Sequence, residues 1–455
     1  MRFFSKLLAC ALAFACCAVP LRTTYAEEVQ ARRNPCQPTA AELARYEADG
    51  TLGWRRAHME SLHHELPARE LMRRLANGGA DGMLGAQSLA SEHSFMYWDA
   101  SFPSEGDARV LALRISFPQD EVTENRAFAE EDSVEALQQI IGPRIDGTET
   151  ERHEEWFPYE SLDAYYERSS YGKLSVSGEV YDYQAKMPRS SYKDPGSSLL
   201  PEALAALDDQ IDYRQFDGNS DGIIDVAVIR FAGLDEGWGS TWWSSAGEAG
   251  FTQKFDGMGA GTVVLIHEPS HTVEAASALI HEVGHAMGLT DYYREERESH
   301  PEALAKSGLG GIMTFDMMNN TTGDHNGFSK WMLGWIGEDA SSGATVTHVV
   351  ANESGITVRH GDEIQRFLPD AATGEVSATV DMSAFTSDDL EPGDVVVVSN
   401  EDKGPFSSYY LLQYDRYAGN QRVQWLKDDQ EHPLPSGLRV FRVRADKFMG
   451  RVEKT

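Results

Sequence analysis

Cysteine is scarce in this sequence. Its 455 residues include four cysteines, and three of these, Cys10, Cys16 and Cys17, fall within the first 26 residues. If that segment is removed, Cys36 is the one thiol left, so we expect a mature chain without an internal disulfide. A small disulfide-stapled fold is thereby excluded, and an exported chain must draw its stability from a packed core or from bound metal ions.

Long apolar runs are missing beyond the N-terminus. Arg2 and Lys6 precede the apolar run LLACALAFACCAV and TTYA follows it, which is the pattern of a secretory signal peptide cleaved after Ala26. The run is too short to span a bilayer comfortably, and no later segment reaches about 18 continuous apolar residues. We therefore expect residues 1–26 to be a signal peptide, the protein to be secreted, and no membrane span.

Basic residues are too few to balance the acidic ones. The chain has 40 Lys and Arg against 72 Asp and Glu, a net charge of −32. Such a surface repels phosphate backbones and anionic lipid, so we expect no nucleic-acid partner, whereas a soluble chain that binds cations fits the charge. The hydrophobic content of 41% is ordinary for a globular protein and allows a full core.

The sequence divides into three regions that differ in composition and in hydrophobic pattern. Residues 27–104 are polar with helical patches and are typical of a pro-segment or helical N-terminal region. Residues 105–340 mix strand-like runs at 108–118 and 224–233 with helical patterns, including a short helix, a Tyr-Gly turn and a strand over 161–183. Residues 341–455 predict a β-rich C-terminal module with strands at TVTHVVA, SATVDM, DVVVVSN, SSYYLLQYD and LRVFRVRA. The expected fold class is α+β.

The stretch IHEVGHAMGLTDYY, residues 280–293, carries the strongest chemical signal. Residues 272–288 predict a helix, capped by Thr272 and ended by Gly288, and positions four apart on a helix share one face. His281 and His285 can thus offer two imidazoles to one tetrahedral zinc ion. Glu282 projects beside that point, where it can take a proton from a water and hand it to a leaving amine.

The third metal ligand is less certain from spacing. Gly288 allows a sharp turn that brings Asp291 back toward the two histidines, and we favour Asp291. Glu302, on a weak helical pattern downstream, and His325, in TGDHNGF, are the alternatives. Tyr293 offers a hydroxyl near the site and is a candidate for stabilising an oxyanion.

Several segments together resemble the immune inhibitor A family of secreted bacterial zinc metallopeptidases. HEVGHAMGLTDYY is similar to its active-site helix, HExxHxxGxxD, and YYERSSYGKLSVSGEVYDY to its Ser-Tyr-Gly-Lys-Leu segment. GIMTFDMMNNTTGDHNGFSKWMLGWI, residues 311–336, resembles its Met-turn region, and SSYYLLQYDRYAGNQ a later β segment. The similarity covers roughly residues 105–445.

This resemblance implies a zincin-like metalloprotease catalytic domain with Zn²⁺ as its cofactor. It also implies that a methionine, Met318 or alternatively Met317, forms an apolar floor under the metal, although plain core packing explains a buried methionine equally well. Members often carry a histidine near the position that Arg442 occupies, so the role of that histidine has no counterpart here.

An acidic loop, FDGNSDGIIDVAVIRF at residues 216–231, predicts a calcium site. Carboxyl or amide side chains at loop positions 1, 3, 5 and 9, with Gly222 at position 6, match most of a calcium loop, whereas Val228 replaces the bidentate glutamate and a strand follows. The alternative is a plain Asp/Asn/Gly turn before a strand, and the family resemblance also implies a calcium ion. The expected Ca²⁺ donors are Asp217, Asn219, Asp221, the backbone carbonyl of Ile223, and Asp225.

Cys36 lies in RRNPCQPT, ahead of the expected catalytic region. Its thiolate is a candidate for holding a precursor inactive by occupying the open zinc position, and the alternative is an incidental surface cysteine.

The sequence therefore predicts a monomeric, secreted zinc endopeptidase that acts on protein or peptide substrates. Two other functions stay open: a non-catalytic zincin-fold protein that binds a surface ligand, and a zinc hydrolase with a non-protein substrate. The intact Glu282 argues against the first, because binding alone needs no base.

Overall fold

The structure is a computed structural model. It describes residues 38–62, 64, 100–118, 127–293, 315–320, 323–338, 345–387, 390–401, 408–422 and 436–444. The predicted signal peptide, Cys36 and Glu302 lie outside these residues. Helices and sheets are mixed along the described chain, which confirms the predicted α+β class. None of the described helices is long and apolar enough to cross a membrane.

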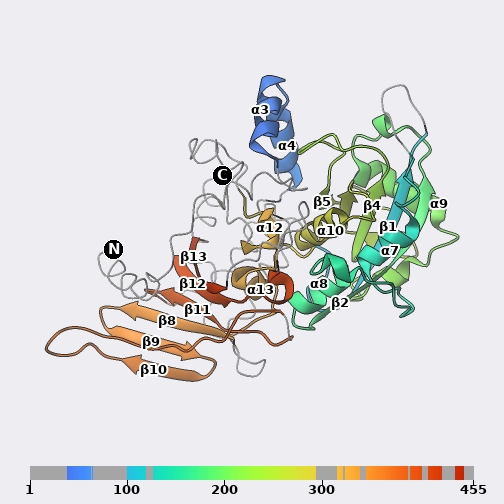
Figure 1. Cartoon of the computed structure of the whole chain (residues 1–455). Helices are drawn as coiled ribbons and strands as arrows, with labels where there is room; N and C mark the ends of the chain where they lie inside the picture. Colours follow the sequence, from blue (N-terminus) through green and yellow to red (C-terminus); the bar gives the residue numbers. More distant parts are fainter. Residues whose placement is uncertain are drawn as a thin grey trace.

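A five-stranded sheet forms the centre of the first half of the chain (Figure 1). Four of its strands run parallel, and the edge strand β5 is antiparallel to its neighbour β7. In spatial order the strands are β2 (Leu174–Gln184), β1 (Gly106–Ser116), β4 (Val226–Phe231), β7 (Thr262–Ile266) and β5 (Ser245–Glu248). Every residue of β4, VAVIRF, is buried, as expected for a central parallel strand that is covered on both faces.

Alternate residues of β1 divide between two hydrophobic cores. Val110 and Ala112 belong to the core with helices α7, α8 and α10, whereas Leu111 and Leu113 belong to the core with α9. The alternation follows from the two-residue period of a strand. The helices are α7 (Val134–Ile141), α8 (Leu162–Ser169), α9 (Leu200–Leu207) and α10 (Val273–Ala286). The predicted Tyr-Gly turn joins α8 to β2, and both of its residues have positive φ.

A six-stranded sheet forms the C-terminal region, on the far side of α10 from the first sheet (Figure 1). Its order is β10 (Glu363–Phe367), β9 (Gly355–His360), β8 (Val346–Asn352), β11 (Val395–Ser399), β12 (Ser408–Asp415) and β13 (Gly437–Arg444). Val395 and Leu411 share the main core with Trp331 and Leu333, in and just after α13 (Gly327–Met332), so this sheet packs on the helix. A two-stranded ladder of β3 (Ile223–Ile224) and β6 (Gly259–Ala260) completes the described sheets.

One predicted C-terminal strand is wrong. The segment SATVDM, residues 377–382, forms no strand, whereas the unpredicted β9 and β10 form a hairpin. Val376, Ala378, Val380 and Met382 instead pack on the small core of the second sheet. An extended segment that lies on a sheet face shows the same alternation as a strand, which explains the error.

The N-terminal region docks on the first sheet through two helices, α3 (Ala40–Ala48) and α4 (Leu52–Leu62). Arg55 of α4 donates hydrogen bonds to the carbonyl oxygens of Glu236, Gly237 and Trp238 at 3.0, 3.0 and 2.6 Å. The Cβ that a side chain would add at Gly239 would lie 2.7 Å from the Arg55 carbonyl oxygen, so the two backbones are in close contact. Two further short helices are α12 (Met317–Asn320) and the 3-10 turn at Tyr213–Phe216.

Candidate metal centre

Helix α10 positions the HExxH residues in the main core. Thr272 caps the helix by accepting a hydrogen bond from the Ala275 N–H at 3.3 Å, as predicted. From Ala275 to Ala286 every residue is buried. Gly284 makes this close packing possible, because a Cβ there would lie 2.4 Å from the sulfur of Met318. Met318 thus lies directly against the turn of α10 between the two histidines.

Both histidines of the motif are oriented by backbone carbonyl groups. The Nδ1 of His281 lies 3.0 Å from the Met317 carbonyl oxygen, and the Nδ1 of His285 lies 2.9 Å from that of Leu289. A carbonyl oxygen only accepts, so each Nδ1 carries a proton, and in the neutral imidazole each Nε2 then has the lone pair. This is the arrangement that metal-binding histidines ordinarily have.

The turn after α10 brings Asp291 to these lone pairs. Gly288 has φ 101, a conformation that favours glycine, and Asp291 follows three residues later. One carboxylate oxygen of Asp291, Oδ1, lies 3.2 Å from His281 Nε2 and 3.4 Å from His285 Nε2. Ligands bound at about 2.0–2.2 Å in a tetrahedral site lie roughly 3.3–3.6 Å apart. Among the described residues neither Asp291 oxygen nor His285 Nε2 forms a hydrogen bond, and both distances to Asp291 Oδ1 match the spacing of neighbouring ligands in such a site.

The electrostatics of this group favour a charged Asp291. Burial raises the pKa of its carboxyl, but His285, His281 and His64 outweigh it and hold that pKa well below the usual range. Burial lowers the pKa of His285 to about 4, with a further contribution from His64. Burial also opposes the charge of His281, but the Asp291 and Glu282 carboxylates raise its pKa to about 9. An anionic carboxylate beside a neutral His285 is a donor set suited to a divalent cation.

Glu282 is buried next to this group, with 1% of its surface exposed. Its carboxylate contributes to raising the pKa of both His281 and His64, against the lowering effect of burial, so it lies within electrostatic range of the two rings. A buried carboxylate at this place can accept a proton from a molecule held between it and the histidines.

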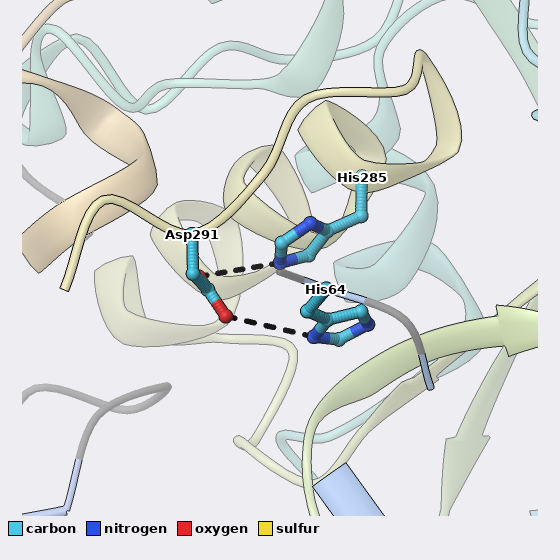
Figure 2. A group of neighbouring side chains, drawn as sticks. All are labelled: His64, His285 and Asp291. Atoms are coloured by element: carbon cyan, nitrogen blue, oxygen red, sulfur yellow. Dashed lines mark ion pairs between the residues drawn. The ribbon is translucent and has the colours of Figure 1, made fainter. Parts of the chain in front are cut away.

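His64 is a member of the site that the sequence did not predict (Figure 2). His64, His285 and Asp291 have ligand atoms within 4.8 Å of one another, and they are the one such group of three or more His, Cys, Asp or Glu found in the described parts of the chain. His281 is not in this group, although its Nε2 lies 3.2 Å from Asp291 Oδ1. His64 Nδ1 lies 3.7 Å from Asp291 Oδ2, and its ring stacks on His285 with centroids 3.8 Å apart. The only trace in the sequence is a pair of histidines more than 200 residues before the motif.

The remaining predicted residues of this region separate into two groups. Met318 and Tyr293 are buried, and the Met317 carbonyl orients His281. His325, an alternative third ligand, has its Nδ1 3.4 Å from Asp316 Oδ1 and packs beside the rings of Tyr166 and Trp335. It therefore belongs to a different buried cluster and not to the Asp291 group. Arg442 lies on β13 of the C-terminal sheet.

The predicted calcium loop has the backbone of a tight acidic turn. Ser220 and Gly222 have φ 62 and 86. Asp217 accepts the N–H groups of Asp221 and Gly222, each at 2.9 Å, and Asn219 accepts that of Asp221 at 3.1 Å. The loop side chains are therefore bonded within the loop, and Ile223 continues into β3.

Asp225 is hydrogen-bonded to backbone N–H groups of β1 and of the loop. Its Oδ2 accepts the Arg109 N–H of β1 at 2.7 Å, and both of its oxygens accept the Gly218 N–H. Burial, opposed by these bonds and reinforced by Asp217 and Asp221, raises the pKa of its carboxyl to about 7. The described geometry thus assigns Asp225 to the junction of the loop with the sheet.

Comparisons with known proteins identify no relative of this chain. No family model matches the chain, and no curated protein matches it significantly. The resemblance to the immune inhibitor A family accordingly stays a prediction that rests on the quoted sequence segments.

Proposed function

We propose that this protein is a secreted zinc endopeptidase with a zincin-like catalytic region. The observation that carries the proposal is that Asp291 Oδ1 lies 3.2 Å from His281 Nε2 and 3.4 Å from His285 Nε2, with buried Glu282 beside them. His281, His285 and Asp291 would hold Zn²⁺. Zinc, when bound, supplies a Lewis acid for the substrate carbonyl and lowers the pKa of a water molecule.

The protein side chains divide the remaining chemistry. Glu282 takes the proton of the attacking water as the water oxygen bonds to the peptide carbonyl carbon. The same carboxyl then passes that proton to the leaving nitrogen as the C–N bond breaks. The Met317 and Leu289 carbonyls keep the two imidazoles in the required tautomer. Tyr293 stays the predicted oxyanion donor.

The edge strand β5 supports a peptide as the substrate. It lies at the end of the sheet, and its neighbour β7 leads into α10. An extended peptide can add to such an edge through main-chain hydrogen bonds. A non-protein substrate would make no use of it.

The experiment is the substitution Glu282→Gln in the full chain, assayed with casein before and after limited trypsin treatment, the trypsin being inhibited before casein is added. We expect the rate to fall by roughly 10²–10⁴-fold, because a carboxamide takes no proton, while zinc content stays the same. Glu274→Gln in the first turn of the same helix is the matched control and should cleave normally. Wild-type zinc content without any cleavage of casein or gelatin would favour the binding protein or the non-protein hydrolase.

The calcium loop is proposed as a second, structural cation site. Its support is the spacing of Asp217, Asn219 and Asp221 and the left-handed backbone at Ser220 and Gly222. In this arrangement Asp225 stabilises the backbone of the loop by accepting the Gly218 N–H.

A further inference from the structure

Asp316 is a buried carboxylate beside the turn that contacts the metal centre. It immediately precedes α12, which lies next to α10 (Figure 1). Its side chain is fully buried. Burying a charged carboxylate is costly unless hydrogen bonds compensate it, so the donors around Asp316 indicate what this side chain does in the fold.

Three donors bind the two oxygens of this carboxylate. Oδ1 accepts the Met318 N–H at 2.8 Å. Oδ2 accepts the Asn326 N–H at 2.8 Å and the Ser329 hydroxyl at 2.7 Å, both at the start of α13. The His325 ring is a more distant neighbour, with Nδ1 3.4 Å from Oδ1. The Asp316 side chain therefore joins the first turn of α12 to the first turn of α13.

The turn that Asp316 holds contacts the metal centre through two backbone carbonyl groups. The Met317 carbonyl oxygen lies 3.0 Å from His281 Nδ1. The Met318 carbonyl oxygen accepts the N–H of Tyr292, the residue that follows the proposed carboxylate ligand, at 2.9 Å. A shift of this turn would therefore move a histidine ligand and the carboxylate ligand together.

A helix cap is the simpler explanation of Asp316. A carboxylate that precedes a helix often accepts an N–H of the first turn, and the bond from Met318 fits that role. A cap does not require the two further donors, Asn326 and Ser329, which hold the second oxygen and fix the carboxylate relative to α13.

We propose that Asp316 is a positioning residue of the metal centre, which keeps the Met317 carbonyl against His281 and so fixes the orientation of that imidazole toward the metal. The inference rests on the proposed function. The partner of the second ring nitrogen sets the orientation and the basicity of a metal-binding histidine, and losing such a partner ordinarily costs 10–100-fold in metal affinity. Asp316 acts one contact further out, through the Met317 carbonyl.

The test compares full-chain Asp316→Asn and Ser329→Ala with wild type, and Asp324→Asn is the matched control. A carboxamide has the size of the carboxylate, but its NH₂ group would face an N–H or O–H donor on one side. Ser329→Ala removes a single bond to the same carboxylate and is the milder change. Asp324 is a second buried carboxylate of this part of the chain, and it bonds Ser169 and Lys330 instead of the turn.

Three quantities are measured for each protein. They are the zinc dissociation constant by competition with a chelator, the visible spectrum of the Co²⁺-substituted protein, and the urea midpoint of unfolding with chelator present. Each substitution should lower the urea midpoint, because it removes a partner from a buried polar group. The zinc constant and the Co²⁺ spectrum separate a positioning role from this general loss of stability.

Asp316→Asn should bind zinc about tenfold more weakly than wild type, at the lower end of the effect of losing a direct partner. Its Co²⁺ spectrum should shift as the His281 ring turns, and Ser329→Ala should show both changes to a smaller degree. Asp324→Asn should unfold at a lower urea concentration but keep the wild-type zinc constant and spectrum.

Two results would overturn this inference and leave the proposed function standing. One is a wild-type zinc constant and spectrum in Asp316→Asn or, if that variant does not fold, in Ser329→Ala. The other is an equal loss of zinc affinity in Asp324→Asn, which would show a general effect of destabilisation. If wild type binds no zinc, the proposed function fails, and the inference with it.

Discussion

Asp291, in the turn after α10, and Asp225, just before β4, are both aspartates whose side chains are buried. Burial raises the pKa of each carboxyl, yet the outcomes are opposite. Three imidazoles around Asp291 hold its pKa well below the usual range, whereas two backbone N–H groups leave that of Asp225 raised to about 7. A buried carboxylate is thus suited to a metal when its neighbours are donors that keep it charged.

The largest expected difference between Asp291 and Asp225 is the effect of their substitution on the zinc content of the protein. Asp291→Asn keeps the size of the side chain but removes the anionic ligand, so zinc affinity should fall by at least about 100-fold, beyond the usual effect of an outer partner. Asp225→Asn should leave zinc content at the wild-type level. Plasma emission analysis after gel filtration measures both. Full zinc retention by the Asp291 variant would remove Asp291 from the ligand set and reopen the choice of Glu302.

The second prediction concerns the loop that precedes Asp225. If Asp217, Asn219 and Asp221 bind Ca²⁺, the ion should stabilise the folded chain by about 2.7 kcal/mol at a concentration 100 times its dissociation constant. Asp221→Asn should abolish that gain, because one ligand charge is lost, whereas Asp209→Asn at an exposed position should keep it. Urea unfolding with calcium and with chelator supplies the values. Equal stability in both solutions would leave the loop as a plain turn.

The smallest expected effect is a change of stability with pH. The pKa of Asp225 is raised to about 7 in the folded chain and is near 3.8 in the unfolded chain, so between these pH values the unfolded chain binds fewer protons. Stability should therefore fall as pH rises from about 4 to 7.

Asp225→Asn carries no titrating proton and should flatten this part of the profile. Urea unfolding of both proteins at several pH values, all with chelator, isolates the contribution. Parallel profiles for variant and wild type would show that Asp225 is already ionised in the folded chain, which would weaken its contrast with Asp291.

Much of the local structure around α10 could be predicted from sequence. The cap at Thr272, the four-residue spacing of the histidines and the glycine turn toward Asp291 all depend on contacts within a few residues. The predicted strand at residues 377–382 is wrong because that segment alternates like a strand while it covers a sheet. His325, the alternative third ligand that was not favoured, packs in a different cluster from Asp291. In both cases the distant partner of the segment decided its role.

The sequence by itself determined the helix, the orientation of His281 and His285 to one face, and the reach of Asp291, because helical period and glycine conformation are local properties. Only the tertiary structure decided that His64 meets these residues and that Asp225 turns to β1. These contacts depend on how α4 packs beside β5 and on the register of β4 against β1. No pattern within a single segment encodes either of them.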